Sequence, residues 1–361
     1  MAKAVAPKLR FPEFSDEWER TKIGDALRVG SGRDYKHLKP GTVPVFGTGG
    51  YMLSVDKPLY SGKSVLIGRK GTIDKPFYYE GDFWTVDTLF YTHEFKGSDP
   101  KYISYVFEKI NWQKHNEASG VPSLSKSTIE KIKINLPSIS EQEKIADFLT
   151  AVDNRISAMQ EKVELLKKYK KGVMQKIFSQ EIRFRDEKGN DYPDWMEKKL
   201  KDLSYITTGK LDANAMLEGG KYRFYTCAKE YYMIDKYEFD TEALLISGNG
   251  ANVGYIHYYK GKFNAYQRTY VLDGFRENII YIKHYLDKFL RRRIFTEKNE
   301  GNTPYIVLPT LANMKINLPT VAEQQKIADF LTSIDDKIQL EERRLAEAKK
   351  FKKSLLQLMF V

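Results

Sequence analysis

Cysteine, histidine and long apolar runs are scarce in this chain of 361 residues. The single cysteine, Cys227, excludes an intrachain disulfide framework and a Cys-based zinc cluster, and it is typical of a reducing cytosol. No run of about 18 apolar residues is present, so we expect no membrane-spanning helix. The N-terminal stretch also lacks the apolar segment of a signal peptide. These absences predict a cytoplasmic protein with no membrane partner.

The patterns that usually carry catalysis or hold a metal are missing as well. The five histidines are scattered, and neither a His-Glu-x-x-His pair nor a Walker-type phosphate loop occurs. The Gly-rich stretch Phe46–Gly50 resembles a cofactor loop, but Pro44 precedes it and no helix-forming run follows, so we interpret it as a tight turn. We predict no catalytic residue, no metal site and no cofactor bound by this chain. An enzyme whose site these patterns do not reveal stays open as an alternative.

Positive charge and apolar residues are plentiful. The net charge is +11, with 59 Lys and Arg against 48 Asp and Glu, and 42% of residues are hydrophobic. The length allows two globular domains with real cores. A strong excess of basic residues favours a polyanionic partner, most commonly nucleic acid. The alternative interpretation is a soluble basic protein that has no such partner.

An internal repeat organises the chain. Lys133–Pro137 (KINLP) recurs as Lys315–Pro319, and Lys144–Thr150 (KIADFLT) recurs whole as Lys326–Thr332. In each copy a Ser or Thr stands three residues before a Glu, which is the spacing of a helix capping box. Apolar residues then follow at alternating spacings of four and three, which predicts two long helices paired through a heptad seam. Lys170 and Lys352 occupy equivalent seam positions and predict a fixed register or a contact with another element.

The segments before these helices repeat more faintly. Gly32-Arg33 matches Gly209-Lys210, and Val65–Gly71 matches Leu244–Gly250, with Arg69-Lys70 replaced by Gly248-Asn249. Both segments contain β-rich stretches followed by a helical stretch. The predicted fold is therefore α/β (α+β): two mixed globular domains separated by two long antiparallel coiled-coil helices, in a pseudo-two-fold internal repeat. The predicted boundaries are 1–137 and 181–319 for the two domains, the second with its linker, and 138–180 and 320–361 for the helical spacers.

Most of the positive charge lies outside the two helices. The helices carry net charges of +2 and +1, so +8 of the +11 belongs to the globular domains and their flanks. Two basic domains held apart by a helical spacer suit a ligand with a repeating backbone, and duplex DNA is the obvious one.

The residues that repeat resemble a known family. The pattern NLP-x3-EQ-x-KIADFLT-x2-D at Asn135–Asp153, repeated at Asn317–Asp335, resembles the conserved regions of the specificity subunit of type I restriction–modification systems. The resemblance covers nearly the whole chain and is specific in the two helical regions. It implies that each globular domain is a target recognition domain reading one half of a bipartite, asymmetric DNA sequence. It also implies two methyltransferase subunits, which carry S-adenosylmethionine and the adenine-N6 chemistry, and restriction subunits that translocate and cut DNA.

Candidate DNA contacts are polar or basic residues on Gly-flanked turns, because Arg and Lys suit guanine edges and phosphates, and Asn and Gln suit adenine edges. They are Arg33, Lys36, Arg69, Lys70, Lys210, Asn249, Asn252, Gln267 and Arg268. Candidate partner contacts are residues of the two helices that are identical in both copies; the Lys and Asp residues among them lie off the apolar seam. They are Glu141, Gln142, Lys144, Asp147, Glu323, Gln324, Lys326 and Asp329. The leading hypothesis is a non-catalytic DNA-specificity subunit; a scaffold whose two basic domains bind protein is the alternative.

Overall fold

The structure is a computed structural model, and it describes residues 6–297 and 305–361. Residues 1–5 and 298–304, which fall within the two predicted recognition domains, lie outside the described residues. The chain divides into two compact units, each containing one mixed domain and a part of each long helix. Unit 1 comprises residues 1–161 and 342–361, and unit 2 comprises residues 162–341.

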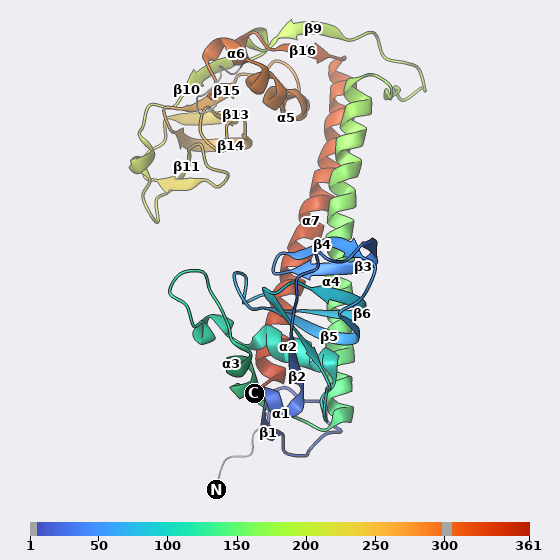
Figure 1. The fold of residues 1–361 in the computed structure, drawn as a ribbon. Helices are drawn as coiled ribbons and strands as arrows, with labels where there is room; N and C mark the ends of the chain where they lie inside the picture. Colours follow the sequence, from blue (N-terminus) through green and yellow to red (C-terminus); the bar gives the residue numbers. More distant parts are fainter. Residues whose placement is uncertain (1–5, 298–304) are drawn as a thin grey trace. The chain divides into compact units, whose positions relative to one another are not determined.

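The domain of unit 1 is built on a six-stranded sheet in the order β2-β7-β5-β6-β3-β4 (Figure 1). Neighbouring strands are antiparallel except β3 and β6, which are parallel. The strands are β2 (Arg28–Ser31), β3 (Pro40–Gly47), β4 (Gly50–Val55), β5 (Tyr60–Gly68), β6 (Phe77–Thr85) and β7 (Leu89–His93). The helices are α1 (Ile23–Ala26), α2 (Pro100–Lys109) and α3 (Lys126–Lys131), with a 3-10 turn at Trp112–His115. The Phe46–Gly50 stretch is the β3–β4 hairpin turn, as predicted, with Gly47 paired to Gly50.

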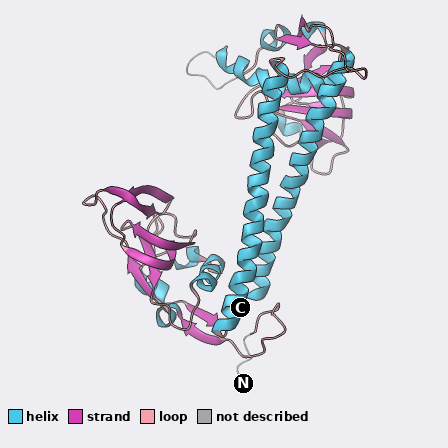
Figure 2. Ribbon diagram, turned by 90° about the vertical axis from the view of Figure 1, so that its right-hand side faces the viewer, coloured by secondary structure: helices cyan, strands magenta, loops and turns pink. Residues whose placement is uncertain are grey.

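Unit 2 repeats this sheet strand for strand, in the order β10-β15-β13-β14-β11-β12. Its parallel pair, β11 with β14, falls at the same place in the strand order as β3 with β6 in unit 1. Figure 2 shows the strands of both units in magenta and the long helices in cyan. The strands are β10 (Tyr205–Thr208), β11 (Tyr222–Tyr225), β12 (Tyr232–Ile234), β13 (Phe239–Ser247), β14 (Ile256–Ala265) and β15 (Thr269–Asp273). The helices are α5 (Ile279–Thr296) and α6 (Leu308–Ala312), with 3-10 turns at Leu200–Asp202 and Ala213–Ala215.

Each domain also has a two-stranded sheet formed by the segments that begin and end it. In unit 1, β1 (Glu19–Lys22) pairs with β8 (Lys133–Leu136), and in unit 2, β9 (Met196–Lys199) pairs with β16 (Lys315–Leu318). The repeated KINL segments are thus the last strands of the domains. The following Pro ends each strand because it has no N–H to donate to a sheet.

The two long helices are α4 (Ile139–Phe178) and α7 (Val321–Met359). In unit 1 the beginning of α4 (Ile145, Leu149) shares one core with the end of α7 (Leu355, Met359). In unit 2 the roles are exchanged, and the end of α4 packs with the beginning of α7. Within each unit the two helices therefore run antiparallel and bury the predicted apolar seam.

The two lysines in the seam have carboxylate partners. Lys170 donates to both oxygens of Asp335, at 2.6 and 2.7 Å. Its counterpart Lys352 lies 2.8 Å from Asp153 and 2.8 Å from Glu108 of α2. Burial disfavours the charge on Lys352, but its hydrogen bonds to Asp153 and Glu108 outweigh that effect and raise its pKa. The prediction that these positions fix the register or meet another element is confirmed.

Candidate nucleic-acid interface and partner surfaces

Two glycines set equivalent loops close to the backbone of a neighbouring segment. A Cβ on Gly32 would lie 1.9 Å from the Val86 carbonyl oxygen, and one on Gly209 would lie 1.9 Å from that of Ala265. Only glycine permits such an approach. The next residues, Arg33 and Lys210, are exposed, so each unit presents a basic side chain from a loop that its glycine holds in place.

The loops after β5 and β13 are also equivalent in position. Arg69 N–H donates to the Thr88 carbonyl at 2.8 Å, and Gly248 N–H donates to that of Arg268 at 2.9 Å. The structural alignment agrees with the one drawn from sequence, which pairs Arg69-Lys70 with Gly248-Asn249. The two units therefore place different side chains on the same backbone frame.

In unit 1 the structure brings Arg69 and Lys70 together at a cavity of about 430 Å³. The cavity is also lined by Lys126, Ser31 and Ser123 among others. The guanidinium of Arg69 lies 5.9 Å from the centre of the Phe90 ring. Lys36 is exposed in the loop between β2 and β3 and does not line this cavity.

In unit 2 the predicted residues gather around Cys227. Its thiol donates to Asn249 Oδ1 at 3.0 Å and lies 3.4 Å from the Arg268 carbonyl oxygen. Asn252 Nδ2 donates to the Cys227 carbonyl at 3.0 Å. Asn249, Asn252 and Arg268 thus form one cluster, held by a loop after β11 that sequence reasoning did not single out.

The other two candidates in unit 2 are directed at carboxylates. Lys210 Nζ lies 2.5 Å from Glu238 Oε1, and Gln267 Nε2 lies 3.4 Å from Asp212 Oδ1. Both side chains are exposed, so these contacts can exchange with a ligand.

Sequence reasoning missed Arg223 of β11. Its guanidinium carbon lies 4.3 Å from the centre of the Tyr231 ring and 4.5 Å from that of Tyr259. A hydrogen bond to the Tyr225 hydroxyl raises the pKa of Arg223. The sequence does show an Arg and several Tyr residues in β11 and the strands beside it. However, the placement of Arg223 between the Tyr231 and Tyr259 rings depends on strand pairing, which the sequence does not specify.

The repeated Glu-Gln pair of unit 1 is buried within the unit. Arg10 forms a two-pronged ion pair with Glu141, with both N–O distances at 2.7 Å, and Trp18 Nε1 lies 3.3 Å from the same carboxylate. Gln142 accepts from the Asp99 N–H at 2.9 Å and donates to the Pro137 carbonyl at 2.9 Å. Hydrogen bonding to Glu141 raises the pKa of Arg10.

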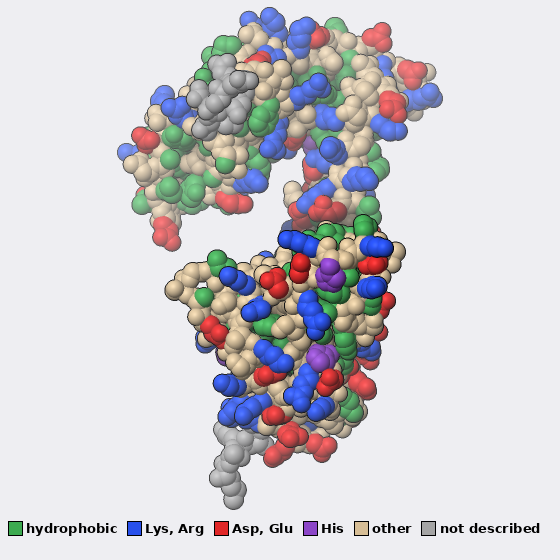
Figure 3. All heavy atoms as spheres, in the orientation of Figure 1, with side chains coloured by type: hydrophobic (Ala, Val, Ile, Leu, Met, Phe, Trp, Pro, Cys, Tyr) green, Lys and Arg blue, Asp and Glu red, His purple; other side chains and the backbone are tan. Residues whose placement is uncertain are grey.

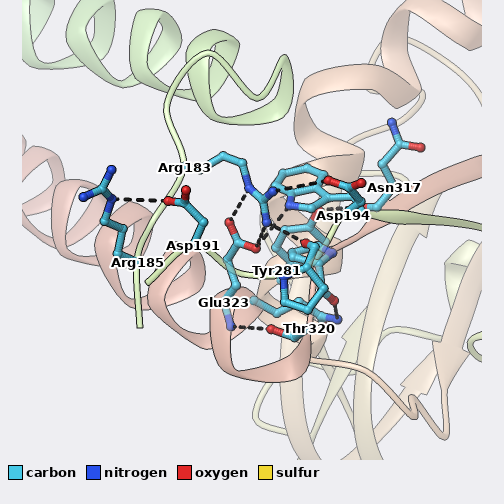
Figure 4. A network of polar contacts seen from close by, with 12 residues as sticks. Arg183, Arg185, Asp191, Asp194, Tyr281, Asn317, Thr320 and Glu323 are labelled. Atoms are coloured by element: carbon cyan, nitrogen blue, oxygen red, sulfur yellow. Dashed lines mark hydrogen bonds and ion pairs between the residues drawn. The ribbon is translucent and has the colours of Figure 1, made fainter. Parts of the chain in front are cut away.

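Unit 2 builds the same network, shown in Figure 4. Arg183 donates to both oxygens of Glu323, at 3.2 and 2.8 Å, and Trp195 Nε1 lies 3.2 Å from Glu323 Oε2. Gln324 accepts from the Asn278 N–H at 3.0 Å and donates to the Pro319 carbonyl at 2.9 Å. An Arg-Phe pair before each Trp is thus part of the repeat, and the sequence search missed it because its spacing to Trp differs between the copies.

Two expectations are corrected by these networks. Glu141, Gln142, Glu323 and Gln324 were predicted to contact a partner, but all four are buried and bonded inside their own units, so internal structure explains their repetition. The reciprocal capping box is also wrong, because each Glu carboxylate pairs with Arg rather than turning back to its cap. The Thr320 hydroxyl still accepts from the Glu323 N–H at 3.4 Å.

The remaining partner candidates are accessible in both units. Lys144 pairs with Glu13, and its ammonium lies 5.1 Å from the centre of the Phe11 ring. Lys326 donates to the Arg185 carbonyl at 2.7 Å. Asp147 and Asp329 are exposed. Contact of these four residues with a partner stays a prediction.

Charge on the surface is mixed. On the face drawn in Figure 3, Lys and Arg side chains are interspersed with Asp and Glu. Among residues 6–297 and 305–361, no group of three or more His, Cys, Asp or Glu side chains is arranged to hold a metal ion. No helix in this described part of the chain is both long and apolar enough to cross a membrane.

A comparison with known proteins matches each copy of the internal repeat separately. The family model described as "Type I restriction modification DNA specificity domain" matches residues 15–168 and again residues 192–350. The chain belongs to this family. Each of the two matches covers one mixed domain and most of the long helix that follows it, so the specificity domain is present twice.

Curated relatives of this specificity-domain protein include two type I restriction enzyme specificity subunits. The EcoDI subunit of Escherichia coli is 38% identical over 45% of this chain and 37% of its own length. The MjaVIII subunit of Methanocaldococcus jannaschii is 26% identical over 67% of this chain and 64% of its own length. The chain thus spans less than two thirds of the length of either relative.

A solved structure shares the fold over the whole chain. The S subunit of a type I restriction-modification system from M. genitalium superposes with a TM-score of 0.72, at 17% identity over 99% of each chain. At this identity the likeness concerns the fold. It agrees with the predicted α/β architecture of two mixed domains and two long helices.

Proposed function

We propose that this chain is a non-catalytic specificity subunit that recognises a bipartite, asymmetric DNA sequence. Each mixed domain reads one half of the target. Family membership supports a role in DNA sequence recognition. The division of the target into two different halves is our inference from the two units.

The observation that carries the proposal is that the loops after β5 and β13 have equivalent backbone positions in the two units but bear different side chains. Unit 1 offers Arg69 and Lys70, which suit guanine edges or phosphates. Unit 2 offers Asn249 at the position of Lys70, and an Asn amide pairs with the N6 and N7 atoms of adenine. Two readers of equal architecture and unequal chemistry require a target with two unequal halves.

Partner subunits would supply the chemistry. We propose two methyltransferase subunits that bind S-adenosylmethionine and methylate adenine at N6, and restriction subunits that complete the enzyme. The duplicated long helices support two equivalent docking positions, and Lys144, Asp147, Lys326 and Asp329 are among the accessible repeated residues near their N-terminal ends. This activity belongs in the cytoplasm, where the target DNA lies.

The test is the methylation pattern of the reconstituted complex. The full chain, combined with the methyltransferase subunit of its own restriction system, should methylate adenine in a two-part motif read by long-read sequencing. Replacing residues 1–135 by the corresponding domain of another member should change one half of the motif and leave the other half and the gap unchanged. A motif that changes in both halves, or the absence of any two-part motif, would contradict the proposal.

A salt titration separates DNA reading from a protein-binding scaffold. DNA binding that neutralises phosphates weakens steeply as salt rises, because counterions are released. We expect that dependence for the wild-type chain on duplex DNA. Affinity for duplex DNA that does not change between low and physiological salt would favour the scaffold.

A further inference from the structure

Unit 2 has a cavity of about 370 Å³ between helix α5, the loop after β11 and the loop between β13 and β14. Lys229 lines it from the loop after β11, and Lys283 and Arg291 line it from α5. Asn252 also lines the cavity, and its side-chain amide donates to the Cys227 carbonyl. The cavity therefore adjoins the cluster of candidate DNA contacts around Cys227.

Positive charge dominates this cavity. Lys283, Asp287 and Arg291 follow one another at intervals of four residues, so they lie on one face of α5. Lys283 Nζ lies 2.8 Å from Asp287 Oδ2. Within the described residues, neither Lys229 nor Arg291 has a carboxylate at ion-pair distance. Three cations and one carboxylate give the cavity a net charge of +2.

The three consecutive arginines of α5 have different environments. Arg291 lines the cavity. Arg292 is exposed and does not line it. Arg293 is half-buried and lies 2.9 Å from Glu297 in an ion pair. Arg291 and Arg292 therefore form a matched pair, with equal charge at adjacent positions but different access to the cavity.

Unit 1 has no cations at the equivalent positions. Helix α2 has 10 residues and α5 has 18, so Arg291 lies in a helical extension that α2 lacks. Counted from the start of each helix, Arg291 corresponds to Trp112, which is buried. Lys229 lies in the loop between β11 and β12, where unit 1 has the uncharged pair Thr48-Gly49.

The cations of unit 1 come from elements that carry none in unit 2. Arg69 and Lys70 follow β5, whereas residues 248–255, which follow β13, contain no Lys or Arg. Arg69, Lys70 and Lys126 line the unit 1 cavity together with Glu117, which again makes three cations and one carboxylate. Each unit therefore has a cavity with a net charge of +2, although different elements supply the charges.

We infer that the unit 2 cavity holds a phosphate of the DNA backbone beside the half of the target that unit 2 reads. This inference rests on the proposed function and deepens it. Asn249 and Asn252 are uncharged, so they can read a base edge but cannot neutralise a phosphate. Arg291 and Lys229 supply that charge from outside the reading loop, and the fork of the Arg side chain matches phosphate oxygens.

The first experiment measures DNA affinity against salt. The full chain and its variants are purified with the methyltransferase subunit of the same restriction system, and fluorescence anisotropy follows binding to duplexes with and without the two-part motif. Arg291→Ala should weaken binding to both duplexes about tenfold, the loss of one charged hydrogen bond. It should also reduce the slope of log affinity against log salt by about 1. Asp287→Asn should tighten both about threefold, because Lys283 loses its internal carboxylate.

Two further variants serve as controls. Arg292→Ala removes the same charge from the next position of the same helix and should keep the wild-type affinity and slope. Arg291→Lys retains the charge and should retain the slope. Thermal unfolding should be unchanged in every variant, because Asp287, Arg291 and Arg292 are exposed.

A second experiment locates the phosphate. Uncharged methylphosphonate linkages are placed one at a time along the half of the motif that exchange of residues 1–135 leaves unchanged. One linkage should weaken binding of the wild-type complex and have no effect on the Arg291→Ala complex. If no position shows this dependence on Arg291, the inference is wrong.

The possible failures are distinguishable. A wild-type complex that shows no salt-dependent binding to either duplex overturns the proposed function together with this inference. Equal effects of Arg291→Ala and Arg292→Ala overturn this inference alone. Loss of base preference in Arg291→Ala at an unchanged slope would make Arg291 a base reader, which also overturns it. Because ADP carries phosphate too, ADP binding that Arg291→Ala abolishes without weakening DNA binding would assign the cavity to a free nucleotide instead.

Discussion

Units 1 and 2 share one backbone architecture but differ in the side chains that their loops present. Both have the same sheet order, the same parallel pair and the same Arg–Glu–Trp network at the start of a long helix. The loops diverge: Arg69-Lys70 stands where unit 2 has Gly248-Asn249. Constancy of the buried contacts and variation of the loops show that the architecture is fixed independently of the side chains on these loops.

The units also differ where each domain meets the helix pair. In unit 1 the Tyr105 hydroxyl donates to Asp153 at 2.9 Å, and Lys352 bridges Asp153 to Glu108. His284 of unit 2 stands in the place of Tyr105, 4.0 Å from Asp335, with no hydrogen-bond partner on either ring nitrogen. The polar tie between domain and helices is therefore stronger in unit 1.

The largest expected effect would break the feature common to both units. Glu141→Ala or Glu323→Ala removes the buried carboxylate that Arg and Trp share. We expect each to lower the free energy of unfolding by about 3 kcal/mol, because two charged hydrogen bonds from the half-buried Arg and one from the Trp indole lose their acceptor. Denaturant titration measures the loss, and hydrogen exchange should locate it in unit 1 for Glu141→Ala and in unit 2 for Glu323→Ala. Glu143→Ala, at an exposed neighbour, is the control. A loss confined to the wrong unit would refute the assignment.

A second pair of variants would sharpen the difference between the joints. Lys352→Met leaves two carboxylates without their cation, whereas Lys170→Met leaves one. We expect a loss of about 2 kcal/mol for Lys352→Met and about 1 kcal/mol for Lys170→Met, in the range of charged hydrogen bonds. Thermal and denaturant unfolding measure both, with exposed Lys353→Met as the control. Equal losses would show that the contact with α2 adds nothing.

The third prediction concerns pH. Burial, assisted by the charges of Lys283 and Lys170, lowers the pKa of His284 to about 3. The unfolded chain protonates this imidazole near its ordinary pKa of about 6.5, so the folded state loses stability as pH falls from there toward 3. The loss reaches about 2 kcal/mol at pH 5. It should vanish in His284→Tyr, which copies unit 1; parallel pH profiles for wild type and variant would exclude the effect.

The smallest effect separates phosphate contact from base reading. Lys70→Ala should reduce the slope of log affinity against log salt by about 1, because one phosphate contact is lost. Asn249→Ala should leave the slope unchanged and relax base preference in one half of the target. Fluorescence anisotropy on duplexes that vary in one half at a time measures both. The reverse pattern would exchange the roles of these residues.

Sequence reasoning located the helices well because their contacts recur at a fixed spacing. The seam and the register-fixing lysines follow from local periodicity, and the KINL strands follow from the repeat. The sheet order did not follow, because strands such as β3 and β6 pair across long stretches of chain. The burial of Glu141 was missed for the same reason: its partner Arg10 lies 131 residues away. In the candidate interface, Asn249 and Asn252 were identified because they flank a glycine turn. The loop that contains Cys227 and contacts both of them is distant in sequence, so residue spacing could not predict it.

The small β1–β8 and β9–β16 sheets have a consequence for how such proteins diversify. In each domain the first and the last strand pair with each other through hydrogen bonds. The chain therefore enters and leaves the domain at the same place, and all of the domain lies between these two strands. Recombination with break points in these two strands would therefore transplant a whole mixed domain while leaving the helices and their register intact. Under the proposed function, one such event would create a new combination of half-sites.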